Sequence, residues 1–138
     1  MQHINRSTEK IKTAIHELPF SPLEKVKGLR VKEYFLKRDM YELYQMRMSK
    51  PADRLAPYTT NDIEKQYGLI AEETDEIFTT KEKDGIKLYT TLSILTAAVQ
   101  ELEAKHDGEM KVLEEKHKVD MERMNDRLEV LEQLLLQK

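Results

Sequence analysis

The last third of the chain repeats apolar residues at intervals of three and four, and this spacing constrains the fold more than any other feature. From Leu92 to Leu135 the intervals run 3, 4, 3, 4, 4, 3, 4, 4, 3, 4, 3, 4. Such alternation lines one face of an α-helix and is typical of a coiled coil. We therefore predict a long helix over 91–138 that forms a trimeric coiled coil. Its core positions, called the seam below, are Leu92, Leu95, Val99, Leu102, His106, Met110, Leu113, His117, Met121, Met124, Leu128, Leu131 and Leu135.

Two steps of four in succession lengthen the repeat to 11 residues, from Val99 to Met110 and again from Met110 to Met121. An 11-residue period is close to that of a straight helix, so the left-handed supercoil should relax there. The alternative is a single amphipathic helix lying on its own domain. A helix this long spans about 70 Å, which the upstream part is too small to cover, so we favour self-association.

The seam contains two histidines, His106 and His117. In a trimer each would form a ring of three imidazoles around the axis. Such a ring could bind an anion or a metal ion, or act as a pH-sensitive weak point. We favour the simpler interpretation, in which a polar core position fixes register and strand number. Because buried imidazolium groups are disfavoured, acidification is expected to loosen this segment.

Composition changes near residue 90. All nine aromatic residues, six Tyr and three Phe, precede it, whereas 91–138 has no proline and one glycine. We therefore predict a small α+β domain over 1–90, and a chain that is α+β but mainly helical. An arm at about 38–64 is expected to be inserted in this domain.

Local signals place the elements of the small domain. Ser21 before Pro22 predicts a helix that Gly28 ends. Residues 31–36 are β-branched and aromatic and predict a strand, and Asp39 is expected to cap a second helix reaching 48. We further expect a buried strand at 68–71, a helical turn at 72–78, and a tight turn at Asp84-Gly85 between 77–81 and 86–89.

Composition excludes several classes of function. The chain has no cysteine and a net charge of −3, which excludes disulfides and thiol catalysis and argues against a dedicated nucleic-acid binder. No apolar run approaches the length of a membrane span, and no signal-peptide pattern opens the chain. The glycines form no phosphate loop, and the histidines (His3, His16, His106, His117) are not at metal-ligand spacing. We expect no metal and no cofactor.

One pair near the N-terminus could support chemistry. Lys12 follows Ser7 by five residues. A lysine amine can activate a serine hydroxyl when desolvation keeps the amine neutral, and Ser–Lys is an attested arrangement in serine hydrolases. Such a serine could attack the peptide bond directly before it, which gives self-cleavage rather than turnover. The alternative is that Ser7 caps a first helical turn.

The order of several segments then carries a resemblance. Ser7 to Lys12 is followed by LEKVKGLRVKEYFL (23–36), YGLIAEETDEIF (67–78) and DGIKLYTTLSILTAAVQELEAK (84–105). This series resembles the C-terminal intramolecular chaperone domain of endosialidases, phage tail spikes and neck appendage proteins, which also occurs in myelin regulatory factor. The resemblance reaches about residue 105 and is nearest to the neck appendage proteins. Thr8 departs from it, since the family usually has Asp there.

The resemblance implies a function. The chain would be a homotrimer that assembles a preceding β-rich fibre of the same polypeptide and is then released. Ser7 would be the nucleophile, Lys12 its base, and Arg6–Ser7 the cleaved bond, as in a single-turnover self-cleaving serine peptidase. The expected location is the host cytoplasm during phage assembly, with the parent protein in the virion tail or appendage. The alternatives are a structural trimerisation module that does not cleave and, least favoured, a hydrolase acting on other substrates.

Overall fold

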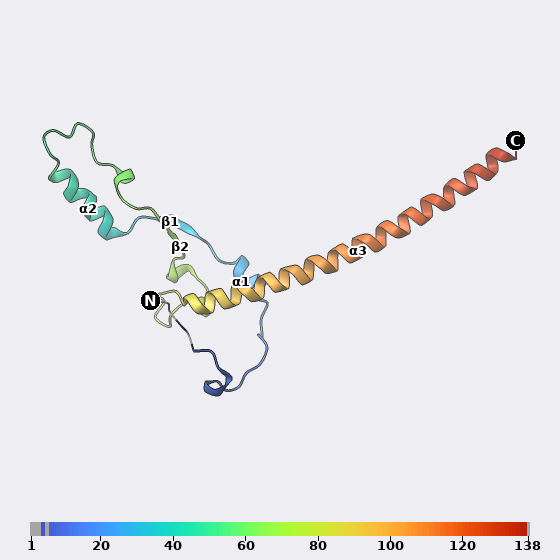
Figure 1. Cartoon of the computed structure of the whole chain (residues 1–138), viewed down its shortest axis with the longest axis horizontal. Coiled ribbons are helices and arrows are strands. Elements are labelled where there is room, and N and C mark those ends of the chain that lie inside the picture. Colours follow the sequence, from blue (N-terminus) through green and yellow to red (C-terminus); the bar gives the residue numbers. More distant parts are fainter. Residues whose placement is uncertain (1–3, 5, 138) are drawn as a thin grey trace. The chain divides into compact units, whose positions relative to one another are not determined.

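A computed structural model of the chain describes residue 4 and residues 6–137; His3 therefore lies outside the described residues. It combines a small two-stranded sheet with helices and ends in one long helix (Figure 1). The predicted mixed, mainly helical class and the long C-terminal helix are confirmed, whereas the trimeric coiled coil remains a prediction. The chain divides into two compact units, one formed by residues 25–96 and one by the N-terminal residues up to 24 together with 97–137. Each is described by itself.

The sheet lies in the unit of residues 25–96. Strand β1 (Lys32–Tyr34) pairs antiparallel with β2 (Gln66–Gly68), with Lys32 opposite Gly68. β1 thus falls within the predicted strand at 31–36. The strand predicted at 68–71 is placed wrongly: β2 ends at Gly68, which pairs with the first residue of β1, so the chain beyond Gly68 has no partner strand. The Tyr34 ring lies over Gly68, where an added Cβ would come within 3.1 Å of the Tyr34 hydroxyl oxygen.

Two separate 3-10 turns replace the single helical turn predicted at 72–78. They are η3 (Ala71–Glu73) and η4 (Glu76–Phe78). The break occurs because side chains take over the backbone groups between them: the Thr74 hydroxyl donates to the Ile70 carbonyl at 2.7 Å, and the Asp75 carboxylate accepts from the Ile77 amide at 3.0 Å. Such local hydrogen bonds compete with continued helix.

The tight turn predicted at Asp84-Gly85 is displaced: the Lys83 amide donates to the Thr80 carbonyl at 3.0 Å, so the hydrogen-bonded turn spans Thr80 to Lys83 and Asp84-Gly85 follow it. The Thr80 amide donates to the Gly85 carbonyl at 2.9 Å, and the Thr80 hydroxyl donates to the Asp84 carboxylate at 2.7 Å. Only one β-bridge, between Thr79 and Ile86, joins the two sides among the described residues. The second side does not continue as a strand, because helix α3 (Leu88–Leu136) begins two residues later.

Helix α2 (Lys37–Met48) forms the first half of the predicted arm. The prediction that Asp39 caps it is wrong: the helix begins two residues earlier, and Leu36 precedes it without a side-chain cap. Asp39 instead lies in the first turn, where a carboxylate is favourable near the positive helix end. The arm returns through the 3-10 turn η2 (Thr60–Asp62), where Thr59 and Asp62 form a capping box.

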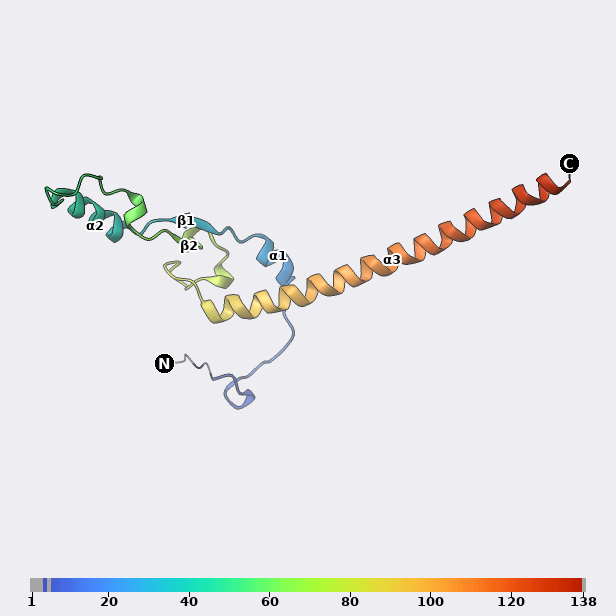
Figure 2. The same cartoon turned by 45° about the horizontal axis from the view of Figure 1, so that its top comes forward.

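The unit of residues up to 24 and 97–137 contains the short turn η1 (Glu9–Ile11), the start of helix α1 (Pro22–Lys27) and most of α3. As predicted, α1 begins at Pro22 and ends before Gly28, and the Ser21 hydroxyl oxygen accepts from the Glu24 amide at 3.2 Å. Helix α3 has 49 residues and is unbroken in both views (Figures 1 and 2). It begins three residues before the predicted start.

Few apolar side chains are buried in the described residues. They are Leu43, Ala71, Phe78, Ile94 and Ala98, and Phe78 is fully enclosed. With so small a core, each buried side chain has a large share in the stability of a single chain.

Substitution of Leu43, which is 1% exposed, is expected to show this. Leu43→Ala should destabilise the chain by about 2–5 kcal/mol, because it removes buried methyl groups and leaves a cavity. Leu55→Ala is the matched control, since Leu55 is 93% exposed in the same arm and its loss should change little. Urea unfolding followed by tyrosine fluorescence measures both. Equal midpoints for the two variants would contradict the burial of Leu43.

Candidate functional site

The seam lies on the solvent-exposed surface of α3. Its apolar side chains range from 41% exposed at Met110 to 69% exposed at Leu135, and both seam histidines are exposed. The buried residues of this helix, Ile94 and Ala98, lie on a different face, since each directly precedes a seam residue. Successive residues are 100° apart around a helix. The face that packs within the chain is therefore not the face that carries the seam.

The structure brings the predicted pair Ser7 and Lys12 together. Thr8 caps η1 by accepting from the Lys10 amide at 3.4 Å, and the Lys12 amide closes the turn on the Glu9 carbonyl at 3.0 Å. This turn folds Lys12 back so that its Nζ donates to Ser7 Oγ at 2.7 Å and to the Ser7 carbonyl at 3.2 Å. Thr8, not Ser7, is therefore the cap of this turn.

The surroundings of the pair decide its chemistry. Arg6, Ser7 and Lys12 are all exposed in the single chain. Desolvation is what allows a lysine amine to act as a base toward a serine hydroxyl. The spacing suits proton transfer, but the amine has no cover that would favour its neutral form.

A second polar cluster joins the N-terminal segment to α3 within the unit of residues up to 24 and 97–137. Glu101 of α3 accepts hydrogen bonds from the Ser21 hydroxyl at 2.7 Å and from the Leu23 amide at 2.8 Å. The Ser21 hydroxyl, followed by the Leu23 amide, holds the pKa of Glu101 below its usual value. We call this cluster the Glu101 clasp, because it fixes the start of α1 against α3.

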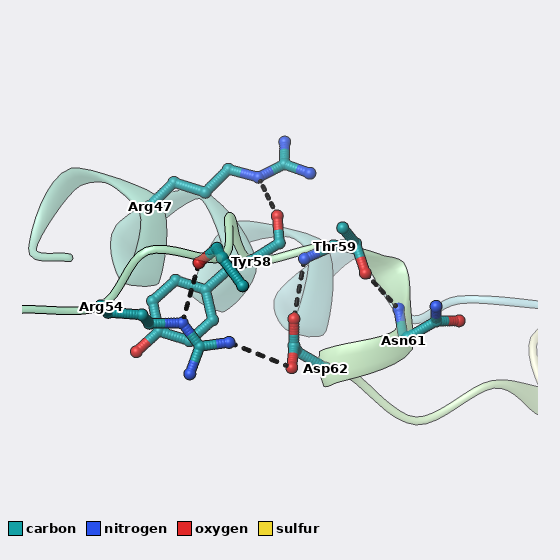
Figure 3. A network of polar contacts seen from close by, with 7 residues as sticks. Arg47, Arg54, Tyr58, Thr59, Asn61 and Asp62 are labelled. Atoms are coloured by element: carbon teal, nitrogen blue, oxygen red, sulfur yellow. Dashed lines mark hydrogen bonds and ion pairs between the residues drawn. The ribbon is translucent and has the colours of Figure 1, made fainter.

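The arm is held by a third network (Figure 3). The Arg54 guanidinium stacks on the Tyr58 ring, 3.8 Å from the ring centre, and pairs with Asp62 at 3.7 Å. The Arg47 side chain donates to the Tyr58 carbonyl at 2.9 Å. Tyr58 is thus committed to packing within the arm.

Helix α2 buries Leu43 on one face and leaves apolar side chains exposed on another. Met40, Tyr41, Tyr44 and Met48 are exposed there. They fall on one side of the helix, because three are spaced by four residues and Tyr41 adjoins them. The arm therefore presents an apolar, partly aromatic stripe of its own.

In the unit of residues 25–96, Lys25 pairs with Asp75 at 2.8 Å. The Ile77 amide, followed by Lys25, lowers the pKa of Asp75. The lowered pKa of Asp75 therefore follows from a local cap and an ion pair. Its neighbours Glu72, Glu73 and Glu76 are exposed. The acidic pairs thus have no arrangement that sets them apart as catalytic.

No group of metal-ligating side chains occurs among residues 4 and 6–137. Within that same part of the chain, no helix is both long enough and apolar enough to cross a bilayer. Searches against protein-family models, curated proteins and solved structures found no match.

Sequence reasoning did not find the Glu101 clasp. Ser21 and Glu101 are 80 residues apart, and each has an ordinary local role as a helix cap and a charged helix residue. A glutamate next to a seam residue is ordinary on a helix and gave no sign of its partner.

The clasp should respond to acid. Because the folded-state pKa of Glu101 lies below its ordinary value of 4.5, its contribution is complete above about pH 4.5 and is lost as pH falls through the lower folded value. The Leu23 amide resonance in an NMR titration should therefore shift with a midpoint below 4.5. Glu101→Gln should abolish this shift, whereas Glu103→Gln should leave it. A midpoint at or above 4.5 would contradict the clasp.

Proposed function

We propose that the chain is a self-associating assembly module, a homotrimer whose coiled coil gathers the segments that precede it in the polypeptide. The exposed seam of α3 carries this proposal. A long helix gains most of its stability from packing an apolar face, not from its own propensity. Here that face runs the length of α3 and is open to solvent in the single chain. In associated copies, the apolar seam side chains of each helix would be buried against the seam side chains of its neighbours.

Gathering three chains has a physical benefit for a β-rich client. Interwound β-structure has high contact order, so chain entropy is lost before distant contacts form. Upstream segments that are linked to one trimer meet at an effective concentration far above their concentration as separate chains in solution. The resemblance to intramolecular chaperones of phage fibres supports this role for an upstream segment of the same polypeptide, in the host cytoplasm during phage assembly. The parent protein would then belong to the virion tail or appendage.

The exposed stripe of α2 is a candidate surface for contact with such a client. Met40, Tyr41 and Tyr44 are available, together with Met48. Met46 and Tyr58, which the same idea would include, are half-buried in the arm. Flexible methionine side chains suit surfaces that must accept varied partners.

Release would follow from the Ser7–Lys12 pair. A neutral Lys12 amine takes the Ser7 Oγ proton, and Oγ attacks the Arg6 carbonyl carbon. The Arg6–Ser7 C–N bond breaks, the Ser7 nitrogen gains a proton, and an ester joins Arg6 to Oγ. Water then hydrolyses the ester, leaving a carboxylate on Arg6 and a free Ser7. The 2.7 Å contact supports the first proton transfer.

This chemistry needs a cover over Lys12 that the single chain does not provide. Burial disfavours an ammonium and so favours the neutral amine. A second copy or the upstream segment would have to supply that burial, which places cleavage after assembly.

A trimerisation module that does not cleave is the second candidate. The exposure of Ser7 and Lys12 favours it, because the contacts of Lys12 Nζ with the hydroxyl and carbonyl of Ser7 are then accounted for by holding a short turn.

The intact mass of the chain expressed behind its native upstream segment separates these candidates. We expect a fragment beginning at Ser7 for the unmodified sequence and an uncut chain for Ser7→Ala. Lys12→Arg should also block cleavage, because arginine keeps the positive charge but cannot act as a base. Lys10→Arg is the matched control and should cut normally. Uncut chains throughout would leave the non-cleaving module, and a monomer in sedimentation at micromolar concentration would exclude both candidates.

The seam histidines give a further test of assembly. Melting of α3 followed by circular dichroism should occur at a lower temperature at pH 5 than at pH 7, because three imidazolium rings would repel around one axis. A variant with both His106 and His117 replaced by Leu should lose this difference. An unchanged melting temperature in the unmodified chain would mean that the rings do not face a shared core.

A further inference from the structure

Two seam residues, His106 and His117, lie on the midline of the exposed stripe of α3. Each is four residues from the seam residue before it and four from the one after it. A step of four turns about 40° beyond a full turn of the helix, so the two seam neighbours of each histidine lie about 40° to either side of it. Every other seam residue with neighbours on both sides has a step of three on one side. The midline positions of the seam are therefore both histidines.

The two histidines also end a short repeat. LEAKH (102–106) is followed 11 residues later by LEEKH (113–117), and every side chain of both segments is exposed. Eleven residues make three turns and about 20° of a fourth, with a rise of about 16 Å. Helix α3 therefore presents the same leucine, glutamate, lysine and histidine twice, on nearly the same face. A polar residue that only interrupts the seam would not need the same neighbours each time.

Self-association would bring copies of each histidine together, and this step rests on the proposed homotrimer. A closed assembly of three identical chains has a threefold axis, so equivalent residues lie at the same height around it. Side chains on the midline of the stripe face that axis, so three His106 imidazoles would meet there, as would three of His117. Within one chain the described residues form no metal-ligating group. The expectation of no metal considers one chain only, whereas a trimer supplies ligands from three.

A ring of three imidazoles has an unmet requirement. Each neutral imidazole has one N–H donor and one acceptor nitrogen. The seam neighbours of each histidine are one leucine and one methionine, which offer no N–H or O–H donor. Three acceptor nitrogens would therefore converge in apolar surroundings, where buried polar atoms normally have a partner. A cation on the axis would accept all three lone pairs at once.

A carboxylate accompanies each ring. Glu103 precedes His106 by three residues, and Glu114 precedes His117 by three. Residues three apart are neighbours on a helix surface. Histidines that bind a metal commonly donate their other ring N–H to a carboxylate, which fixes the orientation of the ring. The glutamate of each repeat is placed for that role, and its charge would offset part of the charge of an ion.

We propose that His106 and His117 form two axial metal sites in the homotrimer, each binding one Zn²⁺ through three imidazole nitrogens, one from each copy. Water completes the four-coordinate arrangement. Imidazole ligands suit zinc, whereas Ca²⁺ and Mg²⁺ prefer oxygen ligands. Each ion would link all three chains, so zinc would strengthen the assembly that the seam begins. A polar residue that only fixes register would need no ion.

Zinc binding to the full chain tests the proposal. The chain is first treated with a chelator and dialysed, and Zn²⁺ is then titrated by calorimetry at neutral pH. We expect saturation at two ions per three chains. Because zinc would bind only the assembled form, two sites at a free zinc concentration ten times the dissociation constant should lower the concentration of half-dissociation about tenfold. Sedimentation equilibrium with and without zinc measures this shift.

Histidine variants assign the sites. His106→Leu and His117→Leu should each bind one ion per three chains, and the double variant should bind none and should assemble equally well with and without zinc. Leucine keeps the seam apolar, so we expect these variants still to associate. The matched control, His3→Ala with His16→Ala, also removes two histidines but leaves the seam unchanged. This control should still bind two ions.

The carboxylates have a variant of their own. Glu103→Gln with Glu114→Gln should weaken zinc binding about tenfold or more, because the rings lose the acceptor for their second nitrogen. Glu115→Gln with Glu129→Gln removes the same charge from α3 at positions that do not precede a histidine by three residues. This second pair should bind zinc almost normally.

Three results would overturn the proposal: a trimer that binds no zinc, binding of one ion per chain, or binding that survives in the variant with both His106 and His117 replaced by Leu. In each case the proposed self-association would stand, because sedimentation of the metal-free chain tests it separately. An unmodified chain that is monomeric with and without zinc would remove both.

Discussion

The exposed apolar stripe of α3 is the constraint on which the rest of this molecule depends. Burial of apolar surface is the main source of free energy in folding, yet the described residues enclose few apolar side chains and leave a 49-residue helix with its seam in water. Much of the apolar surface of α3 is therefore not buried within one chain. If copies associate along this stripe as proposed, folding and association are parts of one equilibrium.

The contacts within one chain are polar and specific by comparison. The Glu101 clasp joins two segments through a carboxylate that accepts from a hydroxyl and a backbone amide, and the arm is held by an arginine stacked on a tyrosine. Each contact fixes the position of a segment with little apolar area. They orient short segments, while the seam remains available.

The sequence predicted the features that depend on periodicity and on local turns. The long helix and the start of α1 at Pro22 are confirmed, because their signals lie within a few residues of one another. The turn predicted at Asp84-Gly85 lies earlier, at Thr80–Lys83. The strand at 68–71 and the cap at Asp39 were wrong. In both cases a neighbour decided the outcome: the first residue of β1 fixes the last residue of β2, and α2 starts directly from an extended Leu36. The Glu101 clasp was missed because no local pattern connects residues so distant. The roles of Ser7, Lys12 and the trimer stay predictions, although the spacing of the pair agrees with the sequence argument.

The turn that carries Ser7 and Lys12 has a kinetic consequence. Its contacts span at most five residues, and loops this short close within well under a microsecond. The two side chains can thus meet in a nascent chain, before any association with other copies. In the proposed cleavage, their meeting would therefore not set the moment of reaction; that moment would depend on the surface that covers the pair last.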